Sequence, residues 1–287
     1  MREIYPILIF LLTFVGISSC HFSAEPPSQN RPVLSTTVRP VAFFMEKIAG
    51  EDFQINVMVP DGMAPVAYEP NAQELVALEN STLYFSLHAL SFERTMLPKI
   101  AKDHPQMELV NLTEGIEMIR EEEAHDHHHG VDPHVWMSPK QAYTLAKNIH
   151  TALVKKFPEK EAMLTQNFQQ LNREIEAMDH YLTQSLQKQL QRSFMIYHPA
   201  LSYLARDYGL EQISIEIEGK EPSPNYLQKV IRLAKEKNMD KLFIQRQFDR
   251  NFAHIVAKET GARVIIFDPL SGDWKKAIQL VTDELRQ

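Results

Sequence analysis

Short apolar runs alternate with amphipathic segments along the first half of the chain. Four runs with the length and side-chain types of strands occur at 33–37, 53–59, 82–87 and 109–112. Segments with the apolar spacing of helices lie between them, at 41–49 and 71–80. This alternation is typical of sheets that are covered by helices. Residues 32–157 are therefore predicted to form an α/β lobe.

The same alternation returns after residue 192. Strands are predicted at 194–197, 212–215, 241–244 and 264–267. Helices are predicted at 227–237, 252–260 and 274–286. A second α/β lobe is therefore expected over 192–287, although the sequence shows no internal repeat of the first lobe.

A long helical segment separates the two predicted lobes. Residues 159–191 contain neither proline nor glycine, and apolar side chains recur there at three- and four-residue steps. This spacing predicts one amphipathic helix of about 30 residues, on the order of 45 Å long. A preceding helix is expected to begin with Ser138 as its cap and Pro139 at its first position, and to end before Pro158. We expect 158–191 to link the lobes; the alternative is a coiled-coil segment.

The amino-terminus has the pattern of a secretory signal. Residues 4–17 are apolar with few interruptions, too short a run to span a bilayer comfortably, and Arg2 precedes them. The run closes at 17–20 (ISSC), which resembles a bacterial lipobox, and Cys20 is the only cysteine. We predict a signal peptide over 1–19, acylation of Cys20 and a tether over 20–31. The alternative is a free thiol behind a plain secretory signal.

Composition narrows the function classes. The chain has 287 residues, 44% of them hydrophobic, and a formal net charge of −7. These values indicate a globular protein that is long enough for one large domain or two ordinary ones. No extended basic patch is present, which gives nucleic-acid binding little support. No phosphate loop, dinucleotide fingerprint or nucleophile with a paired base is present either.

Three distant segments place a histidine or a carboxylate beside a proline. They are 132–136 (DPHVW), 197–200 (YHPA) and 267–270 (FDPL). His198 and Asp268 each follow a predicted strand, and ligands gather beyond the carboxyl ends of strands in α/β layers. Imidazole and carboxylate suit zinc and similar divalent cations. Taken singly, each residue is also compatible with a loop, core or turn role.

The sequence around these motifs resembles the metal-binding solute receptors of bacterial ABC importers, the cluster A-I or cluster 9 family. Residues 198–210 (HPALSYLARDYGL) resemble its third-ligand segment, and 268–274 (DPLSGDW) resemble its fourth. Residues 215–224 follow as they do in zinc-specific members, and weaker similarity reaches back to Pro32. The resemblance implies two α/β lobes joined by one long rigid helix, with a metal site in the cleft between the lobes.

The resemblance also implies a function and a ligand set. His134, His198 and Asp268 would bind Zn²⁺, or Mn²⁺, as the transported ligand, and the imidazole at 198 favours zinc. The receptor would be a lipid-anchored extracytoplasmic monomer, not an enzyme, that delivers the ion to an ABC permease and its ATPase. Two alternatives stay open: a metal-dependent adhesin, and a zinc hydrolase with Glu218 or Glu221 as its base.

The chain departs from the family at the first ligand. The usual histidine falls in a stretch like 62–70, where this chain has Val66. A water, another side chain or weakened binding would each account for the change. His88, at the end of the predicted strand 82–87, is the preferred substitute, whereas Glu69 is expected to hold the loop.

An acidic, histidine-rich run occupies 121–129 (EEEAHDHHH). A flexible loop loses conformational entropy when it orders around an ion, so such a run rarely forms one rigid site. We interpret it as an accessory zinc collector or sensor that uses His125, His127, His128 and His129. The alternative is a solvated acidic spacer.

Overall fold

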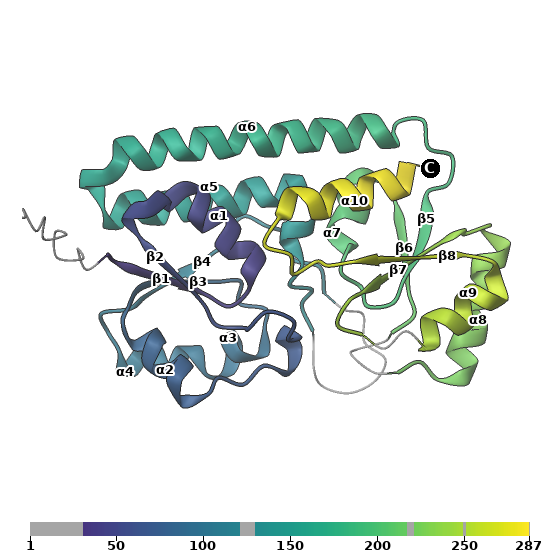
Figure 1. Cartoon of the computed structure of the whole chain (residues 1–287), viewed down its shortest axis with the longest axis horizontal. Helices are drawn as coiled ribbons and strands as arrows, with labels where there is room; N and C mark the ends of the chain where they lie inside the picture. Colours follow the sequence, from purple (N-terminus) through teal and green to yellow (C-terminus); the bar gives the residue numbers. More distant parts are fainter. Residues whose placement is uncertain (1–30, 121–129, 217–220, 249–250, 287) are drawn as a thin grey trace, which may run out of the picture. The chain divides into compact units, whose positions relative to one another are not determined.

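A computed structural model describes residues 31–120, 130–216, 221–248 and 251–286 (Figure 1). The signal peptide, Cys20 and the tether up to residue 30 lie outside the described residues. The histidine run at 121–129 and Glu218 lie outside them as well. The two lobes treated below belong to one compact unit, Pro32–Gln287.

The first lobe is a parallel four-stranded sheet in the order β2-β1-β3-β4. Its strands are β1 (Val33–Thr36), β2 (Gln54–Val57), β3 (Ser81–Ser86) and β4 (Glu108–Asn111). Its helices are α1 (Arg39–Ala49), α2 (Ala72–Glu79), α3 (Ser91–Thr95) and α4 (Leu97–Asp103). Parallel neighbours need a crossover rather than a tight turn, and these helices supply it. All four predicted strands are confirmed.

The second lobe has the same sheet order, β6-β5-β7-β8, and is again parallel. Its strands are β5 (Ser193–Ile196), β6 (Glu211–Ser214), β7 (Lys241–Gln245) and β8 (Arg263–Phe267). Its helices are α7 (Ser202–Tyr208), α8 (Pro224–Glu236), α9 (Asn251–Thr260) and α10 (Trp274–Arg286). The lobes therefore repeat each other in topology, although the sequence shows no repeat.

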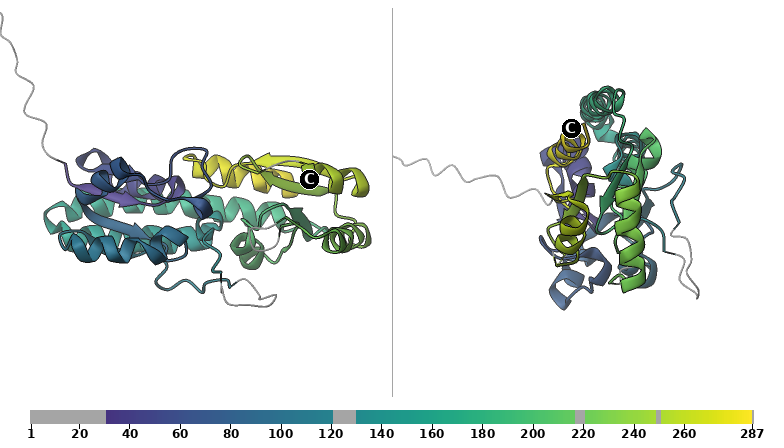
Figure 2. Two further views of the ribbon diagram at one scale, coloured as in Figure 1. Left: turned by 90° about the horizontal axis from the view of Figure 1, so that it is seen from below. Right: turned by 90° about the vertical axis from the view of Figure 1, so that its right-hand side faces the viewer.

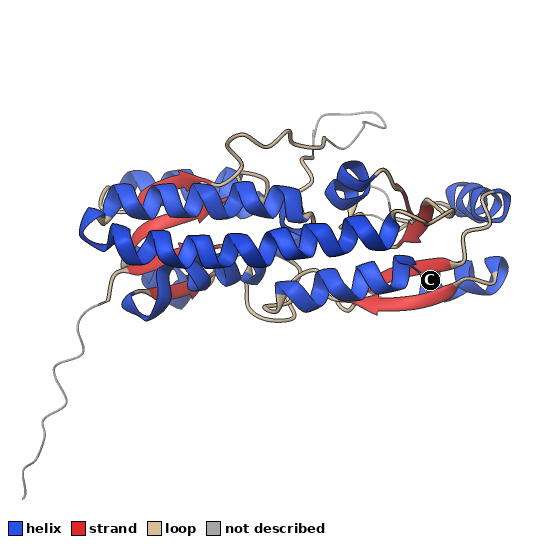
Figure 3. Cartoon of the chain, turned by 90° about the horizontal axis from the view of Figure 1, so that it is seen from above, coloured by secondary structure: helices blue, strands red, loops and turns tan. Residues whose placement is uncertain are grey.

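Along the sequence, two helices separate the strands of the first sheet from those of the second. They are α5 (Pro139–Lys156) and α6 (Glu161–Leu186). The 26 residues of α6 are fewer than predicted, and its rise gives about 39 Å. It lies alongside α5 and also contacts α1 of the first lobe and α10 of the second (Figure 2 and Figure 3). This packing supports a linking helix rather than a separate coiled coil. None of the described helices, α6 included, is long and apolar enough to cross a membrane.

The start of α5 differs from expectation in one respect. Pro139 does occupy the first helical position, but the Ser138 side chain does not cap the helix. Its hydroxyl instead donates to Asp207 Oδ2 at 2.6 Å, and Gln141 donates to the same oxygen. Asp207 lies on α7 of the second lobe, so a tertiary contact has taken the hydroxyl that a local cap would use.

Apolar packing continues across the junction of the two lobes. Trp274, at the start of α10, packs edge-on against Phe44 of α1, with ring centroids 5.3 Å apart. Phe43 lies 6.1 Å from the same indole. These side chains belong to one buried cluster that includes residues of both sheets. Burying such large side chains stabilises the junction.

Candidate metal centre

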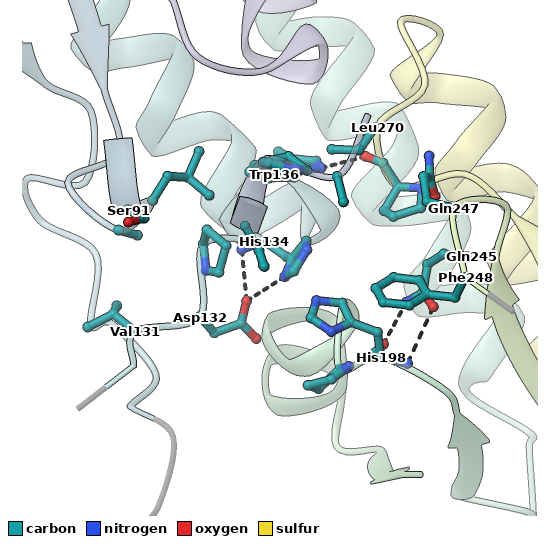
Figure 4. Close-up of a pocket in the computed structure, with 18 of the residues that line it drawn as sticks. Ser91, Val131, Asp132, His134, Trp136, His198, Gln245, Gln247, Phe248 and Leu270 are labelled. Atoms are coloured by element: carbon teal, nitrogen blue, oxygen red, sulfur yellow. Dashed lines mark hydrogen bonds and ion pairs between the residues drawn. The ribbon is translucent and has the colours of Figure 1, made fainter. Parts of the chain in front are cut away.

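The two histidines expected to bind metal meet in a cavity of about 470 Å³ (Figure 4). His134 immediately precedes the 3-10 turn Val135–Met137, which leads into α5, and His198 follows β5. Their ring centroids lie 5.3 Å apart, with 73° between the ring planes. Residues 132–136 and 197–200 are thus brought together from different lobes.

His134 is oriented by the carboxylate two residues before it. Asp132 Oδ1 accepts from the backbone N–H of His134 and from its Nδ1, both at 2.8 Å. Burial alone would raise the pKa of Asp132, but the charge and hydrogen bonds of His134 outweigh burial and lower it. An ionised carboxylate only accepts, so Nδ1 carries a proton, and in the neutral imidazole Nε2 is then the nitrogen with the lone pair. Nε2 of His134 is therefore the atom available to a cation.

His198 is held by three neighbours. Its Nδ1 lies 3.1 Å from Oε2 of the buried Glu216. Gln245 accepts from the backbone N–H of His198 at 3.3 Å and donates to its carbonyl oxygen at 2.6 Å. Phe248 stacks on the imidazole, with centroids 5.1 Å apart and planes 20° apart. Nδ1 is again the nitrogen that faces the carboxylate, which leaves Nε2 for a cation.

Sequence reasoning assigned no role to Asp132, Glu216 or Gln245. The contact between His198 and Glu216 could have been found from the pairing of β5 with β6, where Ile196 lies opposite Ser214. Continued by two residues, this register sets His198 beside Glu216. The signal becomes usable only once the strand order is known, because adjacent strands need not be adjacent in sequence.

Asp268 follows β8 as predicted, yet its carboxylate is bonded elsewhere. Oδ1 accepts from Gln247 Nε2 and from the backbone N–H of Leu270, both at 3.0 Å. The Arg246 guanidinium lies 3.6 Å from Oδ2. Asp268 lines an adjoining hollow of about 710 Å³ rather than the cavity of the two histidines. Across the described residues, no three His, Cys, Asp or Glu side chains converge as a metal-binding group.

His88 also lies away from the pair. It follows β3, but its side chain is exposed and does not line the cavity. Its backbone is left-handed, with φ of 55°, and its N–H is bonded to Ser86 Oγ at 3.0 Å. The prediction that Asp268 and His88 are ligands stays a prediction.

Val66 does line the cavity, at the position where the family's histidine was expected. It lies in the 3-10 turn Pro65–Ala67 and is 56% exposed. The loop is held by Tyr68, whose hydroxyl donates to Glu74 at 2.9 Å. Glu69, expected to hold it, is exposed and makes no hydrogen bond or ion pair with the described residues. The cavity therefore has an apolar wall where a ligand was expected.

Two imidazoles, each backed by a buried carboxylate, are a donor set that suits zinc. A hydrolase would also need a base beside the bound water. Glu221, one of the two bases considered, is exposed and does not line the cavity. The geometry therefore favours holding an ion over cleaving a substrate.

Comparisons with known proteins point the same way. A family model described as zinc-uptake complex component A, periplasmic, matches residues 34–287. The zinc-binding lipoprotein AdcA of Streptococcus pneumoniae is 27% identical over 248 residues, which are 82% of this chain and 49% of that protein. The high-affinity zinc uptake system protein ZnuA of Bacillus subtilis is 27% identical over 275 residues, 91% of this chain and 85% of that protein.

A solved structure extends the similarity to three dimensions. A crystal structure of ZnuA is 32% identical in sequence and has a TM-score of 0.83, covering 90% of this chain and 98% of that one. The two-lobed fold with a linking helix is thereby confirmed. The chain spans about half the length of the streptococcal relative, 49%.

Proposed function

The chain belongs to the family of periplasmic component A of zinc-uptake complexes, and on that premise we propose that it captures Zn²⁺ between its lobes for import. The ion is held by Nε2 of His134 and Nε2 of His198, one from each lobe. Delivery is to an ABC permease and its ATPase. Family membership supports uptake over the adhesin and hydrolase alternatives.

One observation carries the proposal: each imidazole has a buried carboxylate on its Nδ1. Asp132 Oδ1 lies 2.8 Å from Nδ1 of His134, and Glu216 Oε2 lies 3.1 Å from Nδ1 of His198. Such carboxylates fix the ring and its tautomer, and they raise the basicity of the ligating nitrogen. A pair of histidines that only filled the core would not need both carboxylates buried beside it.

The location of the protein belongs to the same proposal. The sequence motif at Cys20 and the lipoprotein name of a relative support an extracytoplasmic protein that a lipid holds to the membrane. The mature chain acts as a monomer in this proposal. Mass spectrometry of the protein from membranes tests the anchor, since an acylated Cys20 must be its first residue. An unmodified Cys20 would contradict it.

Competitive titration with Zn²⁺ and Mn²⁺ tests the capture itself. Zinc is expected to be preferred, because imidazole favours zinc while oxygen donors favour manganese. His134→Ala and His198→Ala are each expected to lower zinc affinity by about tenfold or more, which is about 1.4 kcal/mol. His254→Ala is the matched control, because His254 is exposed on α9 away from the cavity. Unchanged affinity in both cavity variants, or a preference for manganese, would overturn the proposal.

A further inference from the structure

The cavity is larger and more apolar than a bare ion requires. Its volume of about 470 Å³ lies within the range of about 300–1,000 Å³ that is typical of small-molecule pockets. Beside the two histidines, its wall includes Val66, Leu90 and Val131. A hydrated ion gains nothing from apolar side chains, whereas an organic molecule does. The cavity therefore has space and surface for a molecule that accompanies the ion.

Coordination also leaves space for that molecule. Zinc usually takes four ligands in a tetrahedral arrangement, and His134 with His198 supplies two. Val66 cannot coordinate, His88 is outside the cavity, and Asp268 lines the adjoining hollow, with its Oδ1 bonded to Gln247 and Leu270. One chelating molecule with two donor atoms would complete the coordination shell.

Charge indicates what kind of chelator fits. Arg94 lines the same cavity, and its guanidinium has no ion-pair partner within the described part of the chain. Zinc and Arg94 bring three positive charges, while the carboxylates of Asp132 and Glu216 bring two negative ones. The site then has one positive charge in excess, and an anion with a single charge would balance it.

We propose that the cargo is zinc chelated by one α-amino acid, an inference that rests on the proposed zinc capture. The amino acid binds zinc through its amine nitrogen and one carboxylate oxygen, and the proton of its ammonium group goes to solvent. Its carboxylate is paired with Arg94, and its side chain packs against the wall formed by Val66, Leu90 and Val131. Histidine is the probe, because its amine and carboxylate bind zinc and its ring has apolar faces that can pack against this wall.

Equilibrium dialysis with labelled L-histidine and equimolar zinc tests the inference. A site for the bare ion retains zinc without histidine, or gives up part of its zinc because free histidine competes with the protein for the ion. A site for the chelate instead retains zinc and histidine in equal amounts. The His198→Ala variant measures how much zinc and histidine the rest of the chain retains, including 121–129. It is expected to retain no more histidine than a zinc-free sample of the parent.

Two substitutions test the contacts of the bound amino acid, and a third is their control. Val66→His supplies a third protein imidazole at an exposed position, so zinc is expected to remain while histidine is lost. Arg94→Gln is expected to weaken histidine retention by about threefold, the range of an exposed ion pair. Arg232→Gln, on the exposed face of α8, is the matched control and is expected to change nothing.

The outcomes separate this inference from the proposed function. Retention of zinc without histidine by the parent protein overturns the chelate and leaves zinc capture intact. Failure to retain zinc even without histidine overturns zinc capture itself. Equal histidine retention by the parent and His198→Ala would show that histidine binds elsewhere, which also overturns the inference.

Discussion

Trp274 donates its indole N–H to the backbone carbonyl oxygen of Trp136 at 2.6 Å. This bond joins the start of α10 in the second lobe to the turn that carries His134. Trp136 donates in return to the carbonyl oxygen of Pro269, at 2.8 Å. Both indoles are buried. The backbones beside His134 and Asp268 are therefore linked through the two indoles, and Trp136 and Pro269 also line the cavity.

Replacing Trp274 by phenylalanine tests the junction. The carbonyl of Trp136 would lose its partner while it stays buried, and such a loss costs about 1–3 kcal/mol. The free energy of unfolding, measured by urea denaturation, is expected to fall by that amount or more, because packing is also lost. Tyr143→Phe is the control, since Tyr143 is 41% exposed. Equal stability of Trp274→Phe and the parent would contradict this role.

The carboxylate behind His134 gives a second prediction. Asp132→Asn keeps the shape of the side chain, but its amide is a weaker acceptor for the Nδ1 proton. Zinc affinity is expected to fall by about 10–100-fold, the usual effect of such a partner. Asp103→Asn, at the exposed end of α4, is expected to leave affinity unchanged. Equal zinc affinity of Asp132→Asn and Asp103→Asn would contradict this role of Asp132.

The Asp268→Asn variant distinguishes two possible sets of zinc ligands, one completed by a chelating molecule and one completed by the Asp268 carboxylate. If a chelating molecule completes the coordination, the loss of zinc affinity is expected to stay below about threefold, since asparagine can still accept from Gln247. If Asp268 is a ligand, as the sequence predicts, the loss exceeds about tenfold. Zinc titration in the presence of L-histidine makes the measurement. The larger loss would count against the chelate.

Much of the fold could be predicted from the sequence, and the reason is visible in particular elements. All eight strands overlap the predicted runs, and the four that lie inside the sheets, β1, β3, β5 and β7, are largely buried. The helices α3, α4 and α7 were not predicted, because 5 or 7 residues are too few to establish a helical period. The role of Ser138 was mistaken, since its partner Asp207 is remote in sequence.

The site was only partly predictable for a similar reason. His134 and His198 could be singled out by the residues next to them. The partner of His198, Glu216, is set by the register of β5 against β6. Likewise, the contact of Asp268 with Gln247 arises because β7 and β8 are paired, with Gln245 opposite Phe267. Such contacts depend on strand order, which no local pattern specifies.

A buried carboxyl in the first lobe gives a prediction about pH. Burial raises the pKa of Glu93 above 4.5, although hydrogen bonds from Thr37 and from the backbone of Ala89 oppose the shift. A raised pKa means that the folded state binds the proton more tightly, so the stability contributed by Glu93 is lost as pH rises through the folded pKa. The stability of the parent relative to Glu93→Gln is expected to decline as pH rises.

Urea denaturation across the range from about pH 4 to 8 makes the comparison. Glu236→Gln is the control, because Glu236 is exposed at the end of α8. Its difference from the parent is expected to stay constant. A constant difference for Glu93→Gln as well would show that this carboxyl is not held in its protonated form.

The most direct measurement of the central claim is X-ray absorption at the zinc edge. Equimolar zinc is added to a variant that lacks 121–129, so that only the cavity is observed. The account predicts two imidazole ligands with Zn–N distances of about 2.0–2.1 Å. One imidazole is expected to disappear in His134→Ala and one in His198→Ala. A zinc spectrum without imidazole, or one that neither substitution changes, would contradict the assignment of His134 and His198 as the ligands.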